Sequence, residues 1–300
     1  MRFFEHTLFS GLKMILLEEM TFRWLEKFGV GGKEPEKNVP AGFAGSEKEL
    51  EHSEEKRYAS PPEIKSPDEE ILISRRETKV KSLEGGTTHP LFVELKDDGK
   101  GVFKEAAWER ERAVYLIDRF LGLELVPPTV VRQVNGILGS LQRFIPDATL
   151  GGNKDMETHL AACKTDMIKL WLLDIIIDNG DRNYANFLIK NSKVYAIDNG
   201  YSLNYGNKKD SLCYADFEKR ISLYCGYKRF PGENLPVKLA GQMKKFLENT
   251  AGQKILQELL AELIGEDNAR ACLKRIVFVT KMIAEKGAVG SAGEDYLAID

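Results

Sequence analysis

"DNGDRNYANFLI", residues 178–189, places two Asp, three Asn, one Gly and one Arg between two apolar runs. The flanking runs are "LWLLDIII" (170–177) and "FLI" (187–189). Asp, Asn and Gly are common turn residues, because they tolerate left-handed backbone and bond to their own main chain. By itself the stretch is equally typical of a connecting turn and of a functional loop, so the rest of the chain has to decide between them.

The composition excludes several classes of protein. The 300 residues are 43% hydrophobic and carry a formal net charge of -3. A chain of this length and composition can bury a substantial core. It lacks the overall positive charge that favours nucleic acid, so we expect no nucleic-acid partner.

The cysteine pattern indicates a reducing compartment. The four cysteines, Cys163, Cys213, Cys225 and Cys272, are scattered and form no CxxC pair. Free thiols in the cytoplasm are therefore favoured over a disulfide framework or a zinc site. No apolar run reaches the ~18 residues that a transmembrane helix needs, so we also expect no transmembrane segment.

The first 69 residues are predicted to precede the folded domain. Apolar residues in segment 1–30 recur at helical spacing, which predicts an amphipathic helix that docks on the main domain. A peripheral membrane or partner contact is the alternative. Residues 31–69 are rich in Pro, Gly, Ser, Lys and Glu and have no apolar period, so we expect a flexible linker.

A β-rich lobe is predicted over residues 70–146, with its first element near "ILIS" (71–74). "PLFVEL" (90–95) and "GVFK" (101–104) flank an Asp-Gly turn and predict a hairpin. A helix follows over 105–123. "TVVRQV" (129–134) and "LGSLQRFI" (138–145) then flank "NG" as a second strand pair.

An α-rich lobe is predicted over residues 147–300. Segment 155–178 is a long and largely apolar helix, as expected of a buried central helix. "VYAIDNGYSL" (194–203) is predicted to be a strand that ends in a turn. Amphipathic helices are expected over 236–248, 253–264 and 267–285. The order of elements indicates an α+β fold.

Four features in chain order are typical of nucleotide chemistry. The turn formed by Gly85, Gly86, Thr87 and Thr88 would let backbone N–H groups approach phosphate, although a plain hairpin turn has the same composition. Lys104 closes a strand after that turn. Glu109 and Glu111 follow on the next helix, and one of them could hold Lys104 in place.

The fourth feature is the spacing of Asp181, Asn186 and Asp198. In phosphotransferases one carboxylate orients the attacking hydroxyl and accepts its proton. A second carboxylate and a carboxamide hold Mg²⁺ against the nucleotide phosphates, because hard cations prefer oxygen ligands. Together the four features favour a kinase.

These blocks resemble the phosphatidylinositol 3-/4-kinase superfamily, in particular the type II phosphatidylinositol 4-kinases and related plant and microbial kinases. The family pattern Asp-Arg-x-x-x-Asn followed by Ile-Asp-Asn-Gly is met in "DRNYAN" (181–186) and "IDNG" (197–200). "GGTTHPLFVELKDDGKGVFKEA" (85–106) resembles the family's small lobe, as do "ERAVYLIDRFLGLELVPPTVV" and "GSLQRFIPDA". The resemblance covers about residues 80–205 and implies a bilobed, protein-kinase-like fold.

The resemblance also implies roles for individual residues. Lys104 would contact the ATP phosphates and pair with Glu111 rather than Glu109, while Asp181 would be the catalytic Asp. Asn186 and Asp198 would bind Mg²⁺, and Asp178 and Arg182 would support the loop. The implied nucleotide-binding residues are Gly85, Gly86, Thr87 and Thr88 in the phosphate-covering loop and Gln142, Arg143, Phe144 and Ile145 at the adenine hinge.

The sequence departs from the family pattern at one position of the loop. Many relatives carry His after Asp-Arg, whereas this chain has Asn183, so we expect the loop to be supported differently. Segment 204–230, which should shape the acceptor site, is basic and contains aromatic residues. It is either a solvated surface or a face for an anionic acceptor or a membrane.

The expected function is transfer of the γ-phosphate of ATP to a hydroxyl acceptor, with Mg²⁺ as cofactor. Protein Ser/Thr is the first choice of acceptor, since the Ser-bearing linker could serve as a tethered substrate. A phosphoinositide, inositol or other small-molecule acceptor is the alternative. Two further alternatives are nucleotidyl transfer and a catalytically inactive nucleotide-binding module, although Lys104, Asp181, Asn186 and Asp198 are all present.

Overall fold

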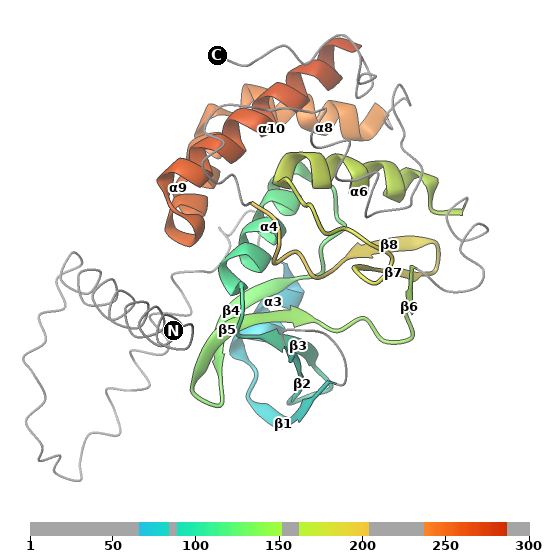
Figure 1. Cartoon of the computed structure of the whole chain (residues 1–300), viewed down its shortest axis with the longest axis vertical. Coiled ribbons are helices and arrows are strands. Elements are labelled where there is room, and N and C mark those ends of the chain that lie inside the picture. The colour runs from blue at the N-terminus through green and yellow to red at the C-terminus, as the bar shows by residue number, and fades with distance from the viewer. Residues whose placement is uncertain (1–65, 84–88, 152–161, 204–236, 287–300) are drawn as a thin grey trace, which may run out of the picture. The chain divides into compact units, whose positions relative to one another are not determined.

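The predicted β-rich lobe contains a five-stranded antiparallel sheet, which the computed structural model shows in the order β1-β2-β3-β5-β4 (Figure 1). The predicted hairpins are present as β2 with β3 and as β4 with β5. The strands are β1 Glu77–Ser82, β2 Leu91–Leu95, β3 Lys100–Lys104, β4 Thr129–Val134 and β5 Ile137–Arg143.

The structure describes residues 66–83, 89–151, 162–203 and 237–286. Four predictions therefore lie outside the described residues. These are the N-terminal helix (1–30), nearly all of the linker (31–69), the turn formed by Gly85, Gly86, Thr87 and Thr88, and the basic segment (204–230).

The segment expected to open the β-rich lobe is a helix, α3, Pro67–Ser74. Ser66 caps it, since its hydroxyl accepts the Glu69 N–H while the Glu69 carboxylate accepts the Ser66 N–H. This capping box, with Pro67 in the first turn, is a strong helix start. The first element of the predicted β-rich lobe is therefore a helix, and it begins inside the stretch expected to be a linker.

Helix α4, Trp108–Leu121, crosses between β3 and β4 and matches the helix predicted over 105–123. Gly122 ends it with φ +66, a left-handed conformation that glycine adopts without steric cost. Acidic residues lie in its first turn and Arg119 in its last, so they complement the helix dipole.

The α-rich part is built from helices and one small sheet. The predicted helices are present, although residues 155–161 of the first lie outside the described ranges. No helix in those ranges is both long and apolar enough to cross a bilayer. The elements are β6 Thr149–Leu150, α6 Lys164–Ile177, β7 Phe187–Lys190, β8 Lys193–Ala196, α8 Val237–Glu248, α9 Thr250–Ile264 and α10 Glu266–Lys286, with sheet order β6-β7-β8.

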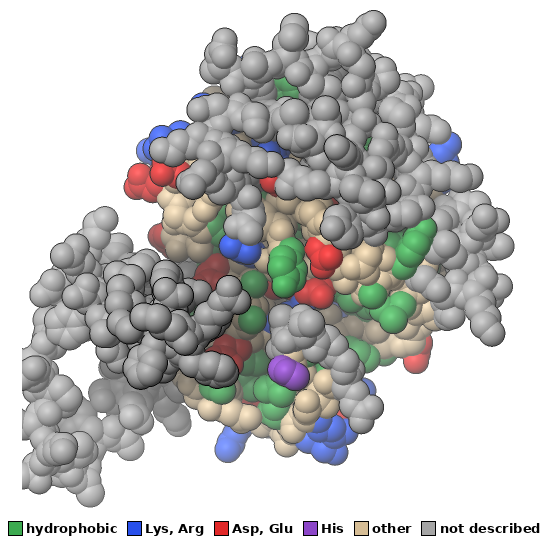
Figure 2. Space-filling view, viewed as in Figure 1, with side chains coloured by type: hydrophobic (Ala, Val, Ile, Leu, Met, Phe, Trp, Pro, Cys, Tyr) green, Lys and Arg blue, Asp and Glu red, His purple; other side chains and the backbone are tan. Residues whose placement is uncertain are grey.

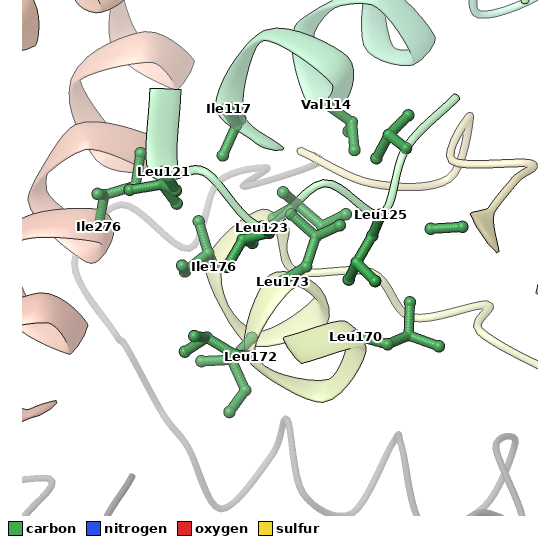
Figure 3. Close-up of a cluster of buried hydrophobic side chains, with 14 of the residues drawn as sticks. Val114, Ile117, Leu121, Leu123, Leu125, Leu170, Leu172, Leu173, Ile176 and Ile276 are labelled. Atoms are coloured by element: carbon green, nitrogen blue, oxygen red, sulfur yellow. The ribbon is translucent and has the colours of Figure 1, made fainter. Parts of the chain in front are cut away.

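Two clusters of buried side chains form the core. The smaller one lies on the five-stranded sheet and includes Val93, Phe103 and Leu141. The larger one joins α4 to the C-terminal helices, with Ile117 and Leu121 in the same cluster as side chains of α6 and α10 (Figure 3). Helix α4 was expected to belong to the β-rich lobe, yet its apolar face packs into the core of the α-rich part.

The surface of the described residues carries both signs of charge. Figure 2 shows Lys and Arg side chains interspersed with Asp and Glu on the visible face. On this face the described residues therefore form no extended patch of positive charge.

One buried ion pair joins α3 to α4. Arg112 and Glu69 side chains are both 0% exposed, and Arg112 Nη1 lies 2.9 Å from Glu69 Oε1. Arg112 Nη1 also donates to the Thr129 carbonyl oxygen at the start of β4. Burial lowers the pKa of Arg112, but Glu69 opposes that shift. The pair therefore holds α3, α4 and β4 together.

We expect Glu69→Ala to destabilise the protein strongly, because it leaves the Arg112 charge buried without its carboxylate. Losing one partner of a buried pair costs about 3–5 kcal/mol, which corresponds to a fall in melting temperature of roughly 10 °C. Glu70→Ala is the control, since Glu70 is exposed on the same helix. Thermal melting checks the prediction, and equal melting of the two variants would contradict it.

A second buried acid lies near the other end of α4. Asp118 is 0% exposed, and its Oδ1 accepts the Leu125 N–H at 2.9 Å, which fixes the connection from α4 to β4. Burial raises the pKa of Asp118 to about 7, although backbone hydrogen bonds and the nearby charges of Arg119 and Lys169 oppose the shift. Since the folded protein binds this proton more tightly than the unfolded chain does, the stability contributed by Asp118 is lost as pH rises.

Stability should therefore fall between pH 4 and 7, the interval between the ordinary pKa of Asp118 and its raised value of about 7. Asp118→Asn keeps an oxygen for the Leu125 N–H and removes the charge, so this part of the pH dependence should disappear. Urea unfolding at several pH values measures it. Asp267→Asn, at a side chain 95% exposed, should keep the wild-type profile, and a wild-type profile for Asp118→Asn would refute the assignment.

Candidate active site

Lys104 contacts two carboxylates that lie far from it in the sequence. Its Nζ lies 2.7 Å from Glu111 Oε1 on α4 and 2.8 Å from Asp198 Oδ1, 94 residues further along the chain. Burial by itself lowers the pKa of Lys104, but the two carboxylates outweigh it and the pKa is raised. Lys104 is therefore a fixed positive charge at the meeting point of three segments.

The sheet positions Lys104. It pairs with Ser140 of β5 across the β3–β5 ladder, so its side chain shares one face of the sheet with Val102. Gly139 makes room for this strand end, because a Cβ on Gly139 would lie 2.4 Å from the Lys104 carbonyl oxygen.

Glu111 receives donors from both parts of the fold. Besides Lys104, the Asn199 backbone N–H donates to its Oε1 at 3.1 Å and Asn199 Nδ2 donates to its Oε2 at 3.4 Å. The Glu111 side chain is only 3% exposed, so a buried carboxylate is matched by a cation and amide donors. The Lys104 contact expected for Glu111 is present.

The loop that follows α6 is organised around Arg182. This fully buried guanidinium bonds both carboxylate oxygens of Asp174, which is also fully buried. It further donates to the carbonyl oxygens of Asn186 and Ile197 and to Asn199 Oδ1. Arg182 thus ties α6 to both polar loops, which is the supporting role that the family resemblance implies.

The short polar residues of the loop stabilise its backbone. Asn179 Oδ1 accepts the Asp181 N–H at 3.0 Å. Asn183 Nδ2 donates to the Asp181 carbonyl, and Asn183 Oδ1 accepts the Ala185 N–H at 2.8 Å. Asn183, which stands where many relatives have His, therefore supports the loop through its own amide, as Asn does in turns.

Asp181 and Asn186 contact each other within this loop. Asn186 Nδ2 donates to the Asp181 carbonyl at 2.7 Å and to Asp181 Oδ2 at 3.2 Å. Among the described residues, nothing donates to Asp181 Oδ1 or to Asn186 Oδ1. Two oxygens therefore remain available to a ligand.

Asn186 and Asp198 provide the right atoms for a hard cation. The Ile197 N–H donates to the Asn186 carbonyl at 3.1 Å, so Asn186 lies beside the residue that precedes Asp198. The Asp198 side chain is 46% exposed, and its backbone is left-handed with φ 53, which Asp tolerates. The described residues hold no group of three or more metal-ligating His, Cys, Asp or Glu. One carboxylate and one amide oxygen fit Mg²⁺, which usually completes its shell with water and phosphate.

Two of the predicted hinge residues, Gln142 and Phe144, form hydrogen bonds to residues of the five-stranded sheet. Gln142 Nε2 donates to Thr129 Oγ1 at 3.0 Å, and the Phe144 N–H donates to the Lys100 carbonyl at 3.0 Å. Among the described residues the Ile145 N–H has no acceptor. Ile145 is thus the hinge position whose backbone donor remains available to a base.

Sequence reasoning missed an apolar surface beside Lys104. Phe92 pairs with Val102 across the β2–β3 ladder, so both share the face that carries Lys104. The Phe144 ring meets the Phe92 ring edge-on, with centroids 5.0 Å apart. All three side chains are half-buried. The alternation in "GVFK", with Val two residues before Lys, was the signal that could have revealed it.

Sequence reasoning also missed Asp174 and Asn199. Asp174 looked like one polar residue in an apolar helix, and no local pattern shows that it pairs with Arg182. Asn199 follows Asp198 in "IDNG", where it could equally be a turn residue. The partners of both residues lie in other elements, so only the folded chain identifies them.

A cavity of about 600 Å³ lies elsewhere along the hinge. Arg143, Phe144 and Ile145 line it, together with residues of α4 and of the β7–β8 turn. None of Lys104, Glu111, Asp181, Asn186 or Asp198 lines it, so the candidate catalytic group does not belong to this cavity.

Solved structures share the fold at low sequence identity. Hydra Fam20, solved with sugar, has a TM-score of 0.51 at 14% identity, over 73% of this chain and 87% of that one. This likeness confirms the kinase-type α+β fold. The Golgi casein kinase with Mn/ADP bound (TM-score 0.46, 14% identity, 82% and 80% covered) and the Helicobacter pylori proinflammatory kinase CtkA (0.45, 10%, 71% and 96%) are also similar.

Sequence comparison confirms the resemblance drawn from the motifs. No curated protein sequence matches the chain significantly. The family model described as phosphatidylinositol 3- and 4-kinase matches residues 164–280, which include α6, both polar loops and the C-terminal helices. The chain therefore has a bilobed α+β kinase fold, and residues 164–280 are similar to the phosphatidylinositol 3- and 4-kinase family, which supports a kinase-type phosphotransferase.

Proposed function

We propose that the chain transfers the γ-phosphate of ATP to a hydroxyl acceptor in a reaction that depends on Mg²⁺. The observation that carries the proposal is the position of Lys104, held between Glu111 at 2.7 Å and Asp198 at 2.8 Å. Kinases require this combination of a paired Lys and a metal-binding Asp.

The remaining residues have complementary roles in the proposal. Lys104 binds the phosphates of ATP, while Phe92 and Val102 cover the base and the Ile145 N–H binds its edge. Asp198 and Asn186 Oδ1 hold Mg²⁺, which neutralises charge on the phosphates when bound.

Asp181 orients the acceptor hydroxyl and takes its proton through Oδ1. Asn186 keeps the Asp181 carboxylate in place through the bond to Oδ2. In such a site the rate comes mainly from positioning and charge stabilisation rather than from covalent chemistry.

Protein Ser/Thr is the acceptor that we propose first, with the chain's own N-terminal segment as a covalently tethered substrate. Ser46, Ser53 and Ser60 are the candidate sites in it. Ser66 is excluded, because its hydroxyl caps α3 and accepts the Glu69 N–H. Cys163 and Cys272 are buried and form no disulfide, which fits a reducing, cytoplasmic location for this activity.

A phosphoinositide or inositol acceptor is the second candidate, and the description of the matched family model favours it. Nucleotidyl transfer uses the same ATP-binding groups and is the third. A catalytically inactive module is disfavoured, because it would not need to keep Lys104, Asp181, Asn186 and Asp198 together.

Two labelled substrates distinguish these activities. The protein is incubated with γ-labelled ATP and, separately, with α-labelled ATP, each with no acceptor, with a Ser/Thr peptide mixture or with phosphatidylinositol vesicles. The proposal predicts γ-label on the protein itself at Ser46, Ser53 or Ser60 and on the peptides. Label on lipid alone would support the second candidate, α-label on an acceptor would indicate nucleotidyl transfer, and no transfer at all would refute the proposal.

We expect Asp181→Asn to lower the single-turnover rate of phosphoryl transfer by about 100-fold or more, because the amide cannot accept the hydroxyl proton. ATP affinity and melting temperature should change little, since Asn keeps the shape of Asp and a hydrogen-bonding oxygen. Asp267→Asn on α10 is the control and should keep the wild-type rate. Wild-type transfer in Asp181→Asn would show that Asp181 is not the base.

Asp198→Ala should abolish most of the stabilisation that Mg²⁺ adds to ATP binding. ATP should raise the melting temperature of the wild type more with Mg²⁺ than with EDTA, by linkage. Asp267→Ala should keep that difference. If Asp198→Ala keeps it as well, the metal ligand has been assigned to the wrong residue.

A further inference from the structure

The side chain that follows Asp198 is buried and polar. Asn199 is 0% exposed, and its amide lies between α4 and the loop that contains Arg182. Buried polar groups need partners, because an unpaired one has lost its hydrogen bonds to water without replacing them. The amide oxygen of Asn199 therefore needs a hydrogen-bond donor, and its amide nitrogen needs an acceptor.

Each end of the Asn199 side chain has a partner of the opposite kind. Its Oδ1 accepts a hydrogen bond from Arg182 Nη2 at 2.6 Å. Its Nδ2 donates to Glu111 Oε2 at 3.4 Å, while its backbone N–H donates to Glu111 Oε1 at 3.1 Å. A carboxamide can accept from a guanidinium at one end and donate to a carboxylate at the other, which an ionised carboxylate cannot do.

Arg182 determines the orientation of this amide. The guanidinium is held by Asp174 and by the Ile197 carbonyl, and both side chains of the ion pair are fully buried. Asn199 Oδ1 is directed toward Arg182, so its Nδ2 is directed toward Glu111. The amide thus links helix α4, through Glu111, to Arg182, which is itself bound to Asp174 of α6.

Two further contacts hold the same helix. Arg110 Nη1 donates to the Gly200 carbonyl at 3.0 Å. The apolar side chains Val114, Ile117 and Leu121 of α4 pack into the core formed with α6 and α10 (Figure 3). In kinases the position of the corresponding helix controls the Lys–Glu pair and hence activity.

We propose that Asn199 is a positioning residue that keeps α4 permanently in the place where Glu111 pairs with Lys104. The phosphate-binding Lys is then in place without a separate activating event such as phosphorylation. The claim about activity rests on the proposed kinase function, but the contact between Asn199 and Glu111 can be tested without any activity.

The first test is a double-mutant cycle measured by thermal melting. Asn199→Asp places a carboxylate against Glu111 and should lower the melting temperature by about 5 °C or more. Adding Glu111→Gln supplies an amide that can donate to the new carboxylate, so at least half of that loss should be recovered. Additive losses would overturn the proposal. If Asn199→Asp does not fold, a double variant that melts cooperatively supports the proposal, and a double variant that also fails to fold overturns it.

Asn268→Asp is the matched control for the cycle. Asn268 on α10 donates through Nδ2 to the Ile264 carbonyl at the end of α9, so the same substitution also removes one donor there. Its effect should simply add to that of Glu111→Gln, because the two residues lie in separate networks.

The second test is the pH profile of single-turnover transfer. Once protonated, the carboxyl group that Asn199→Asp introduces can again donate to Glu111. The activity of this variant relative to wild type should therefore be about tenfold lower at pH 8 and should recover as pH falls toward 5.5. A purely structural defect would give a constant ratio, which would overturn the positioning role.

The third test asks whether α4 keeps its position, and the protein its activity, without an activating phosphorylation. Wild-type protein treated with phosphatase should transfer phosphate at the untreated rate and without a lag. Loss of activity after this treatment would overturn the claim that no activating phosphorylation is needed. If the wild type transfers nothing in any assay, the proposed function fails, whereas the melting cycle still decides whether Asn199 positions Glu111.

Discussion

The guanidinium of Arg182 is the group on which the geometry of the site depends. Removing such a charge from water costs several kcal/mol unless it is fully paired. Asp174 supplies the opposite charge, and carbonyl and amide oxygens from the two polar loops take the remaining donors. Since these oxygens come from separate segments, satisfying one buried charge brings those segments together.

Helix α4 is held on several sides. Glu111 and Arg112 are consecutive residues, which a helix directs about 100° apart. Glu111 reaches Lys104 and Asn199, while Arg112 pairs with Glu69 of α3. The apolar face of the helix lies in the core with α6 and α10. A movement of α4 would therefore break charged contacts and expose apolar surface at the same time.

The polar stretch between the two apolar runs is both a turn and a candidate catalytic loop. Asp178 is left-handed at the end of α6, and Asn179 and Asn183 bond to nearby backbone, as residues of an ordinary turn do. Asp181 and Asn186 differ from them, because each keeps a side-chain oxygen that no described residue uses. The rigid turn holds those two oxygens in a fixed position beside the segment that leads to Asp198.

Local sequence signals were sufficient for most elements and insufficient where an element was short. Asp-Gly and Asn-Gly turns marked both hairpins, and helical spacing marked α4, α6 and the C-terminal helices. The apolar run in "ILIS" was too short to distinguish a strand from a helix. The capping residues before it have the composition of a polar linker, and the burial of Glu69 depends on Arg112, 43 residues away.

The sequence by itself therefore determined the order of elements, the family resemblance and the residues that we propose to bind nucleotide and metal, because turns, helices and motif spacing are local properties of the chain. Apart from the Lys104–Glu111 pair, which the resemblance implied, only the tertiary structure decided which buried charges meet. The pairing of Asp174 with Arg182, the contacts of Asn199 and the packing of α4 into the α-rich core all join segments far apart in sequence. No local pattern encodes such contacts, since burial and pairing exist only once the chain has folded.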